Sequence, residues 1–402
     1  MQKVSWAIVI IIILGWLAYP KFQDFIPNTP PYIPPPAEGE PIPLKLPTGF
    51  SGAVYADNLP GVRVITRGPG AAMFATQTSE GRVVALLDGN NDSKIEGVKT
   101  ILEGLNGPHG IVLLCREGSQ QDCNLYVAEE NAVISYNFDP VTLAATAPEK
   151  IAALPSGTGH STRSLLLHPA GKNLLVSVGS SCNVCHESND RRAKILSINL
   201  ETKEVSEFAR GLRNTVFMTL HPITGEVWGT DMGRDFLGDD LPPDEVNIIR
   251  EGKNYGWPNC YGKNIHDDVF DKNTYIRNPC MEPFEMGSTV DIPAHSAPLG
   301  IAFVPEDPPA QAGGWPDEYW FNALVAYHGS WNRSVPTGYK IARLKWNAKG
   351  EYLGAEDFIT GFITESGNII GRPVALLVEP GGTLYISDDK AGRIYRVFRT
   401  SQ

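Results

Sequence analysis

The chain has 402 residues and a formal net charge of −11, from 34 basic and 45 acidic residues. This length suits one large regular β domain or two average domains. The excess of acidic residues, with no long basic run, argues against nucleic-acid binding. The 40 glycines and 32 prolines exceed the average usage of both and favour a fold rich in turns over one built from long helices.

Residues 1–20 contain an apolar segment that predicts a membrane anchor. Its uncharged run extends from Val4 to Tyr19, a little short for a comfortable span. Because no small-residue cleavage motif follows, we expect an uncleaved signal anchor, with a cleaved signal peptide as the alternative. Residues 21–43 are proline-rich and predict an extended tether. The main body is then expected at the periplasmic face of the inner membrane, or secreted if the segment is cleaved.

A pair of short strands recurs six times between residues 44 and 402. The first strand of each pair reads AMFATQT, NLYVAEE, NLLVSVG, EVWGTDM, ALVAYHG or TLYISDD. The centres of consecutive pairs lie 49 to 61 residues apart, except for one gap of 96 residues that holds an insertion at 259–292. This period is the length of a four-stranded propeller blade with its loops. The pattern predicts an all-β fold, a six-bladed β-propeller over residues 44–402, rather than a β-sandwich.

Cys182, Cys185 and His186 spell C-x-x-C-H, the attachment motif of a c-type haem. The motif lies between two predicted strands of one blade, and no compact helical segment is present to supply a pocket and a second axial ligand. A disulfide is therefore favoured over haem, and free thiols or a bound metal are the remaining alternatives. The other four cysteines pair by position, because Cys115 and Cys123 flank a hairpin loop while Cys260 and Cys280 bracket the insertion.

The segment SGTGHSTRSLLL places His160 directly before an apolar strand. Gly157 and Gly159 allow the backbone to approach a ligand closely. A histidine at the entrance of a strand can act as a general base near neutral pH. Taken alone, however, the motif favours a surface histidine with no catalytic role.

The order of several short motifs resembles the glucose/sorbosone dehydrogenase family, quinoproteins that use pyrroloquinoline quinone (PQQ). The segment HSTRSL is followed by RN at 213–214, by DEVNII at 244–249 and by NYGWP at 254–258. The resemblance covers about residues 44–399. HSTR, SSCNVC and YHGSWNR are most similar to the sorbosone dehydrogenase branch, whose members carry C-x-x-C without haem.

The resemblance implies a role for each matching residue at the cofactor. His160 matches the catalytic base. The residues that match cofactor contacts are Arg213 and Asn214 at the quinone, His295 and Ser296 in a lining loop, and Arg333 and Arg372 at the carboxylates. Arginine suits such a ligand, because its guanidinium binds carboxylates in bidentate fashion. For each arginine alone, a surface ion pair is the alternative.

The resemblance also implies two calcium sites. The carbonyl groups of Gly233 and Arg234 match the ligands of an active-site calcium, although Arg234 stands where the family usually has proline. Glu245 and the carbonyl of Tyr255 match a second, structural calcium site. Oxygen donors of this kind are the ligands that calcium prefers.

The sequence therefore predicts PQQ- and calcium-dependent oxidation of an aldose or related, sorbosone-like sugar aldehyde to the lactone or acid. His160 would be the general base, PQQ would accept hydride, and electrons would pass to a respiratory quinone or cytochrome c. A calcium-dependent lactonase and a non-catalytic propeller that binds a sugar or a protein partner are the alternatives.

Overall fold

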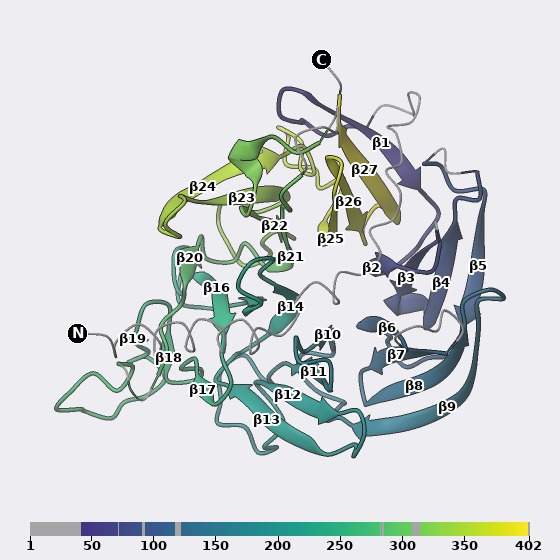
Figure 1. The fold of residues 1–402 in the computed structure, drawn as a ribbon. Helices are drawn as coiled ribbons and strands as arrows, with labels where there is room; N and C mark the ends of the chain where they lie inside the picture. Colours follow the sequence, from purple (N-terminus) through teal and green to yellow (C-terminus); the bar gives the residue numbers. More distant parts are fainter. Residues whose placement is uncertain are drawn as a thin grey trace, which may run out of the picture. The chain divides into compact units, whose positions relative to one another are not determined.

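A computed structural model of the chain describes residues 42–400, except residues 71, 91–92, 117–121, 282, 284 and 308–313. The predicted anchor, and all but the last two residues of the predicted tether, lie outside the described residues. The described chain forms six sheets of four or five strands, and Figure 1 shows them arranged in a ring around a central axis. The predicted all-β, six-bladed propeller is confirmed. Among the described residues, no helix has the length and hydrophobicity that crossing a membrane requires.

The first three blades follow one another along the chain. Blade 1 contains β2 (Val62–Arg67), β3 (Met73–Gln77), β4 (Arg82–Leu87) and β5 (Gly97–Leu102), with a 3-10 turn at Thr78–Glu80. Blade 2 contains β6 (Ile111–Cys115), β7 (Cys123–Glu129), β8 (Ala132–Asp139) and β9 (Ala144–Ala153). Blade 3 contains β10 (Leu165–Leu167), β11 (Asn173–Val178), β12 (Lys194–Asn199) and β13 (Val205–Arg210), joined at its edge by β17 (Lys253–Asn254).

The remaining blades complete the ring. Blade 4 contains β14 (Thr215–Leu220), β15 (Val227–Asp231), β16 (Asp244–Ile249) and β20 (Val290–Ile292). Blade 5 contains β21 (Pro298–Phe303), β22 (Ala323–Tyr327), β23 (Lys340–Trp346) and β24 (Tyr352–Ile359), with a 3-10 turn at Asp317–Tyr319. Blade 6 contains β25 (Pro373–Glu379), β26 (Thr383–Asp388), β27 (Arg393–Arg399) and β1 (Phe50–Ala56).

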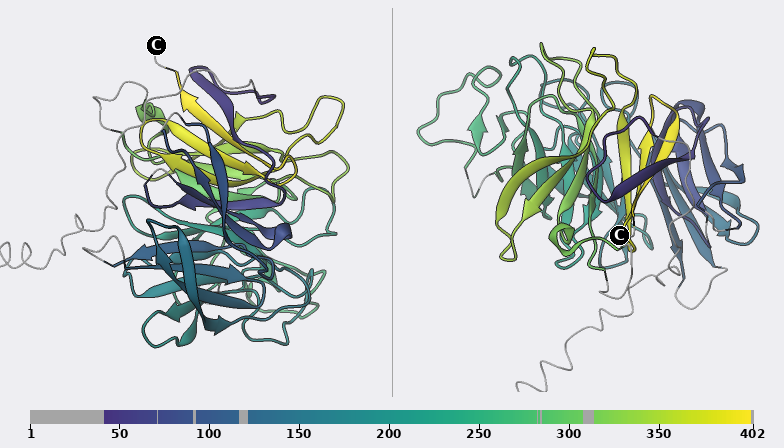
Figure 2. Two further views of the ribbon diagram at one scale, coloured as in Figure 1. Left: turned by 90° about the vertical axis from the view of Figure 1, so that its right-hand side faces the viewer. Right: turned by 90° about the horizontal axis from the view of Figure 1, so that it is seen from above.

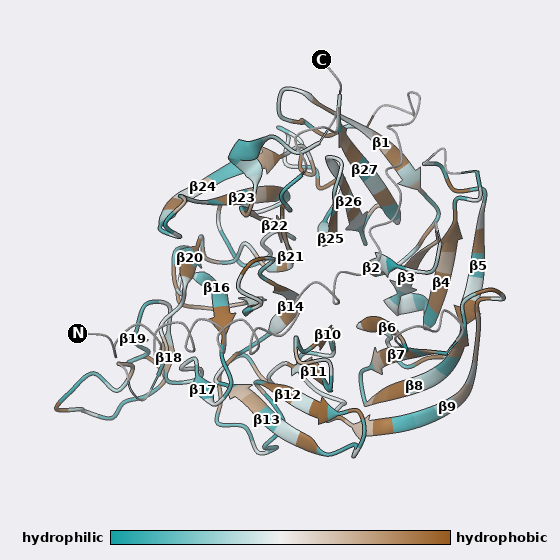
Figure 3. Ribbon diagram, viewed as in Figure 1, coloured by the Kyte–Doolittle hydropathy of each residue, from teal (hydrophilic) through white to brown (hydrophobic). Residues whose placement is uncertain are grey.

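The recurring strand pair of the sequence forms the two middle strands of every blade. β22 illustrates why its sequence is apolar, since all five of its residues are buried. Both faces of a middle strand are covered, because apolar clusters fill the spaces between neighbouring blades. Strands buried on both faces read as continuous apolar runs rather than as an alternation. Figure 3 shows hydrophobic residues concentrated on the strands.

The ring is closed by β1, which comes from the beginning of the described chain. β1 pairs antiparallel with β27, with Phe50 opposite Arg399 and Ala53 opposite Arg396. The ring of Phe50 packs against Trp315, Tyr319 and Phe358 at centroid distances of 5.4 to 5.8 Å. Pairing the first strand with the last blade covers a strand edge that would otherwise be free to pair with another chain.

The insertion differs from its predicted limits of 259–292. Its last residues, β20, form the fourth strand of blade 4 rather than part of the insertion. The part of the insertion that precedes β20 contains a small hairpin of β18 (Cys260–Tyr261) and β19 (Ile265–His266). The Cys260–Cys280 disulfide closes this segment, and the predicted Cys115–Cys123 and Cys182–Cys185 disulfides are also present.

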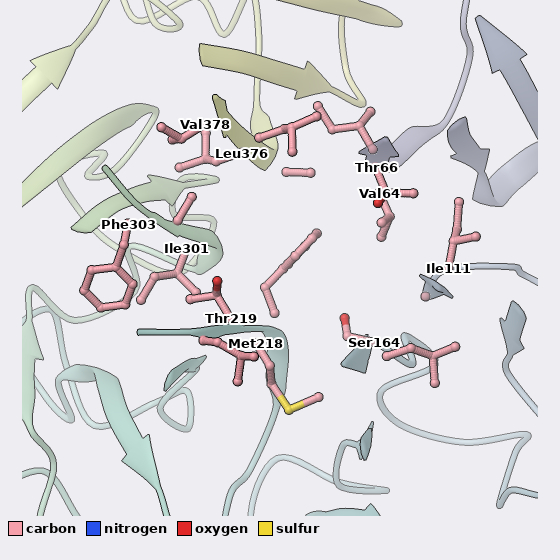
Figure 4. A pocket seen from close by; sticks show the side chains of 18 of the residues that line it. Val64, Thr66, Ile111, Ser164, Met218, Thr219, Ile301, Phe303, Leu376 and Val378 are labelled. Carbon is pink, nitrogen blue, oxygen red and sulfur yellow. The ribbon is translucent and has the colours of Figure 1, made fainter. Parts of the chain in front are cut away.

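The first strand of each blade faces the channel, and these strands enclose a cavity of about 330 Å³. Its lining is mostly apolar, with Val64, Ile111, Phe303 and Leu376 among the side chains in Figure 4. None of the predicted site residues lines this cavity. Most of them lie instead in loops between the strands, whereas Glu245 lies on β16; Figure 2 shows loops projecting from the blades.

Candidate active site

Several of the predicted site residues lie just before the innermost strands of four blades. His160 precedes β10, Asn214 precedes β14, Ser296 precedes β21 and Arg372 precedes β25. Hydrogen bonds join three of these segments to the second strand of a blade or to the loop that follows it. His160 is bonded to Ser180, Ser296 to Gly329 and Arg372 to Asp388. The propeller thus gathers at one end of its channel residues that are scattered in the sequence.

His160 is held by the loop that follows β11. Its Nδ1 lies 3.1 Å from the carbonyl oxygen of Ser180 and 3.1 Å from the Ser180 hydroxyl. That hydroxyl donates its own hydrogen to the carbonyl of Cys182 at 2.7 Å. Both neighbours of Nδ1 therefore act as acceptors, so Nδ1 carries the proton of the neutral ring. Nε2 is left with a lone pair that can accept a proton.

The surroundings of His160 keep its imidazole neutral. Burial is the largest cause, and together with the positive charge of Arg213 it lowers the pKa of His160 from 6.5 to about 4. The guanidinium groups of Arg163 and Arg192 act in the same direction, while the hydrogen bond to Ser180 opposes them. At neutral pH the ring is a proton acceptor, the state that a general base needs.

Two buried arginines hold the backbone of His160 in place. Arg163 donates to the carbonyl oxygen of His160 at 2.8 Å, and Arg192 donates to the same oxygen at 3.3 Å. Gly159 has a φ of +71°, and a side chain there would come within 2.4 Å of the Ser180 carbonyl. Glycine is therefore needed at 159 for the loop to reach its position.

Asn214 lies beside His160. A Cβ atom at Gly179 would come within 2.6 Å of the His160 Cβ and 2.7 Å of the Asn214 Oδ1, so this glycine separates the two side chains. The backbone N–H of Asn214 donates to Asp231 at 2.9 Å. Its Oδ1 is buried and has no hydrogen-bond partner among the described residues. A buried acceptor without a partner is costly, and a bound ligand with a donor would satisfy it.

Arg213 makes all its hydrogen bonds within the protein. Nε donates to the carbonyl of Asn183 at 2.8 Å and Nη2 to the side chain of Asn183 at 2.9 Å. Nη1 donates to the carbonyl of Gly233 at 2.9 Å, and Nη2 also pairs with Asp235 at 3.4 Å. The guanidinium therefore joins blade 3 to blade 4, and its predicted contact with a quinone stays a prediction.

The other two predicted arginines, Arg333 and Arg372, differ in whether a guanidinium N–H group remains available to bind a ligand. Arg333 donates to the Asp239 carbonyl at 2.6 Å and forms an ion pair of 2.8 Å with Asp240. Arg372 donates to the Gly329 carbonyl at 2.8 Å, but its Nε is buried without a partner among the described residues. Arg372 therefore fits a carboxylate ligand better than Arg333 does.

His295 and Ser296 occupy the loop before β21. His295 has a φ of +64°, and its Nε2 lies 2.8 Å from the carbonyl of Gly238. The Ser296 hydroxyl donates to the Pro293 carbonyl at 2.7 Å and is fully buried. Ser296 thus shapes its own loop, whereas His295 connects that loop to the segment after Arg234.

A partly buried group of charged and polar side chains that the sequence analysis missed lies beside Arg372. Arg63 on β2 forms an ion pair of 2.7 Å with Asp389, and His328 contacts the same carboxylate at 3.0 Å. The Nε of Arg63 is buried without a partner among the described residues. The sequence feature that could have indicated this group is Arg63 itself, an arginine within a strand next to the channel. Its partners lie in other blades, so the sequence could not indicate them.

The residues predicted to bind calcium are only partly free to do so. The carbonyl of Gly233 already accepts from Arg213, and the side chain of Arg234 pairs with Asp267 at 2.7 Å. Glu245 accepts from the Gly262 N–H at 2.6 Å and from Asn247 at 2.9 Å. Burial, and then the charges of nearby aspartates, raise the pKa of Glu245 to about 8, so a cation beside it would relieve an unfavourable charge.

The hydroxyl of Tyr255, the other residue assigned to that second site, donates to the Ile248 carbonyl at 2.5 Å. The role of its backbone carbonyl as a calcium ligand stays a prediction. In the described part of the chain, the compact groups of potential metal ligands are Cys182, Cys185 and Glu187, and Cys260, Cys280 and Glu285. Their cysteines form disulfides and have no thiolate to offer. Neither group is a metal site of the predicted kind.

Comparison with known proteins places this geometry in a family. The chain is 38% identical over 241 residues to an uncharacterised protein of Borreliella burgdorferi, covering 60% of each. It is 23% identical to the PQQ-dependent pyranose dehydrogenase of Coprinopsis cinerea, over 89% of this chain and 55% of that protein. The chain thus spans somewhat more than half the length of these curated relatives.

Solved structures show the same fold. The holo PQQ domain of Coprinopsis cinerea pyranose dehydrogenase aligns over 92% of this chain and 100% of that one, with a TM-score of 0.72 and 21% identity. A calcium structure of a Trichoderma reesei family AA12 enzyme aligns over 90% and 99%, with a TM-score of 0.73 and 19% identity. The family model described as TrAA12-like matches residues 44–400, almost the whole described body. The protein therefore belongs to the TrAA12-like family.

Proposed function

We propose that the protein is a PQQ- and calcium-dependent dehydrogenase that oxidises an aldose or a related sugar aldehyde, sorbosone-like in type, to the lactone or acid. The observation that carries this proposal is His160, a partly buried and neutral imidazole whose Nε2 has no hydrogen-bond partner among the described residues. The curated relatives of Coprinopsis cinerea and Hypocrea jecorina are described as PQQ-dependent pyranose and sugar dehydrogenases, which supports the same chemistry.

The residues around His160 fit a planar ligand with several carboxylates. Arg63 and Arg372 each have a buried Nε without a partner among the described residues, and Asn214 has a buried free acceptor. Unpaired donors of this kind favour an anionic ligand that brings acceptors. The carbonyl groups of Gly233 and Arg234, with a second lone pair on the former, are the donors that would hold calcium. Glu245 would serve the second calcium.

PQQ, when bound, supplies the quinone that takes up hydride from the sugar. Nε2 of His160 accepts the proton of the reacting hydroxyl, because the ring is neutral at pH 7 and Nδ1 already holds its hydrogen. Arg163 and Arg192 hold the backbone of His160, so the ring need not reorient during the reaction. Arg213 places a positive charge close to the base. This charge would stabilise negative charge that develops on the ligand.

The proposed location of the protein is outside the cytoplasm. The apolar run at residues 1–20 and the disulfides support a body tethered at the periplasmic face of the inner membrane, or secreted after cleavage. Electrons would then leave through a respiratory quinone or a cytochrome c.

Reconstitution tests the proposal. Purified apoprotein is mixed with PQQ and Ca²⁺, and dye-linked oxidation of a panel of aldoses and sugar aldehydes is followed. We expect turnover only when both additions are present. The matched control is His160→Gln, which should bind PQQ, measured by quenching of tryptophan fluorescence, while losing turnover. Tight PQQ binding without turnover of any sugar would refute the assigned reaction, and the absence of PQQ binding would refute the cofactor.

A further inference from the structure

The loop that contains the Cys182–Cys185 disulfide contacts Arg213 through Asn183, the first of the two residues between the cysteines. The carbonyl oxygen of Asn183 accepts from Nε of Arg213 at 2.8 Å, and its Oδ1 accepts from Nη2 at 2.9 Å. One asparagine therefore holds the guanidinium through both its main chain and its side chain. Arg213 is 5% exposed, so few alternative partners from solvent can replace these bonds.

The same asparagine also binds the neighbouring blade. The N–H of Asp235 donates to Oδ1 of Asn183 at 2.8 Å, and Nδ2 of Asn183 donates to the carbonyl of Asp235 at 3.1 Å. The side-chain amide thus pairs with the main-chain groups of Asp235 much as a peptide group does in a sheet. Because Arg213 also reaches Gly233 and Asp235, three loops meet at Asn183.

The other end of this loop orients the candidate base. The carbonyl oxygen of Ser180 accepts from the backbone N–H of His160 at 3.0 Å and from its Nδ1. The Ser180 N–H donates to the carbonyl of Arg213 at 2.8 Å. Its hydroxyl donates to Cys182. A loop of a few residues therefore contacts both His160 and Arg213, with the disulfide ring between these contacts.

The position of the disulfide argues for a local role. Its cysteines are three residues apart, and cross-links that close short loops restrict the unfolded chain least. Both cysteines are partly exposed, whereas Cys260 and Cys280 are 5% and 0% exposed. The ring therefore adds little to the packing of a core. What it constrains directly is the backbone of Asn183.

We propose that Asn183, fixed by the Cys182–Cys185 ring, is the positioning residue that holds Arg213 beside His160. The proposal deepens the proposed function, since it concerns the same base and the same arginine. It can nevertheless be tested on the apoprotein, where no turnover is needed.

The charged groups around His160 make its pKa sensitive to the position of Arg213, and this pKa can be measured. Arg213 from blade 4, Arg163 from its own segment and Arg192 from before β12 are the charged groups that act on its ring, and all are positive. Asp235 forms an ion pair of 3.4 Å with Arg213. Once the amide of Asn183 is removed, Arg213 loses a charge-assisted hydrogen bond and moves toward Asp235 and solvent. The pKa of His160 should then rise.

Ring NMR of isotope-labelled histidine in the apoprotein measures this pKa directly. We expect Asn183→Ala to raise the pKa of His160 by about one pH unit, the size typical of a neighbouring charge. Val184→Ala, a substitution inside the same disulfide ring, is the matched control and should leave the pKa unchanged. Cys182→Ser/Cys185→Ser should reproduce the rise, and Cys115→Ser/Cys123→Ser should not.

A double-mutant cycle shows whether Asn183 acts through Arg213. In an Arg213→Met background, Asn183→Ala should shift the pKa of His160 by no more than about 0.3 pH unit. An unchanged pKa in Asn183→Ala, or a full additional shift in the Arg213→Met background, would overturn the proposal. In the reconstituted enzyme, Asn183→Ala should lower kcat/KM about 10- to 100-fold, as small displacements of reacting groups do. Failure of the wild-type protein to turn over any sugar would refute the proposed function and leave the NMR result standing.

Discussion

The substitution His160→Gln tests two expected properties of a neutral, desolvated histidine: its action as a general base and its effect on the pH dependence of stability. A glutamine amide can still donate to the Ser180 carbonyl, but it has no group that accepts a proton near neutral pH. The exchange therefore keeps a hydrogen bond that fixes the side chain and removes only the titration. Loss of general-base action should lower turnover at pH 7 about 10²- to 10⁴-fold.

The effect on stability follows from the pKa. In the folded protein the pKa of His160 is about 4, whereas its ordinary value is 6.5. Between these values the unfolded chain binds a proton that the folded chain does not, so the free energy of unfolding decreases as the pH falls from about 6.5 to about 4. The difference in pKa corresponds to about 3 kcal/mol, at 1.36 kcal/mol for each pH unit. The glutamine variant lacks this component.

The contribution of His160 to the free energy of unfolding is measured by urea unfolding of the apoprotein, followed by tryptophan fluorescence at pH 4, 5, 6 and 7.5. Contributions from other buried groups cancel when the variant is subtracted from the wild type. Relative to the variant, the wild type should lose about 3 kcal/mol between pH 7.5 and pH 4. Parallel curves for the two proteins would refute the burial of a neutral imidazole at 160, and near wild-type kcat would refute its role as the base.

Three further outcomes are expected. Deletion of residues 1–36 should give a folded, active protein, because β1 begins only at Phe50; a truncated chain that fails to fold would show that the first residues belong to the propeller. Phe50→Ala should lower the free energy of unfolding by about 3–5 kcal/mol in denaturant titrations, since the ring packs among three aromatic side chains. The matched control Phe236→Ala, whose side chain is 70% exposed, should change it little. Arg372→Met should weaken PQQ binding about 10- to 100-fold in fluorescence titrations, the loss expected for one hydrogen bond to a charged group; an unchanged affinity would exclude Arg372 from the cofactor site.

The architecture could be predicted from local sequence patterns. Strands buried on both faces carry apolar runs that can be read locally, so the six strand pairs and their period were visible without any structure. The three disulfides followed from the positions of the cysteines between those strands. The resemblance of the HSTR, RN and NYGWP segments likewise marked His160 and its neighbours, because short motifs preserve the local backbone that a ligand requires.

Contacts between side chains of different blades could not be predicted in this way, because they depend on the folded ring. The pairing of β1 with β27 joins residues almost 350 positions apart, as with Phe50 and Arg399, and no local pattern specifies such a partner. The same holds for Arg63 and Asp389, which lie in different blades. Arg213 was recognised from its motif, but that Asn183 and Asp235 engage its guanidinium depends on how two neighbouring blades present their loops. The sequence gives the chemical type of each side chain. Its partners depend on the closure of the ring, because hydrogen bonds and ion pairs require atoms to come within a few ångströms of one another.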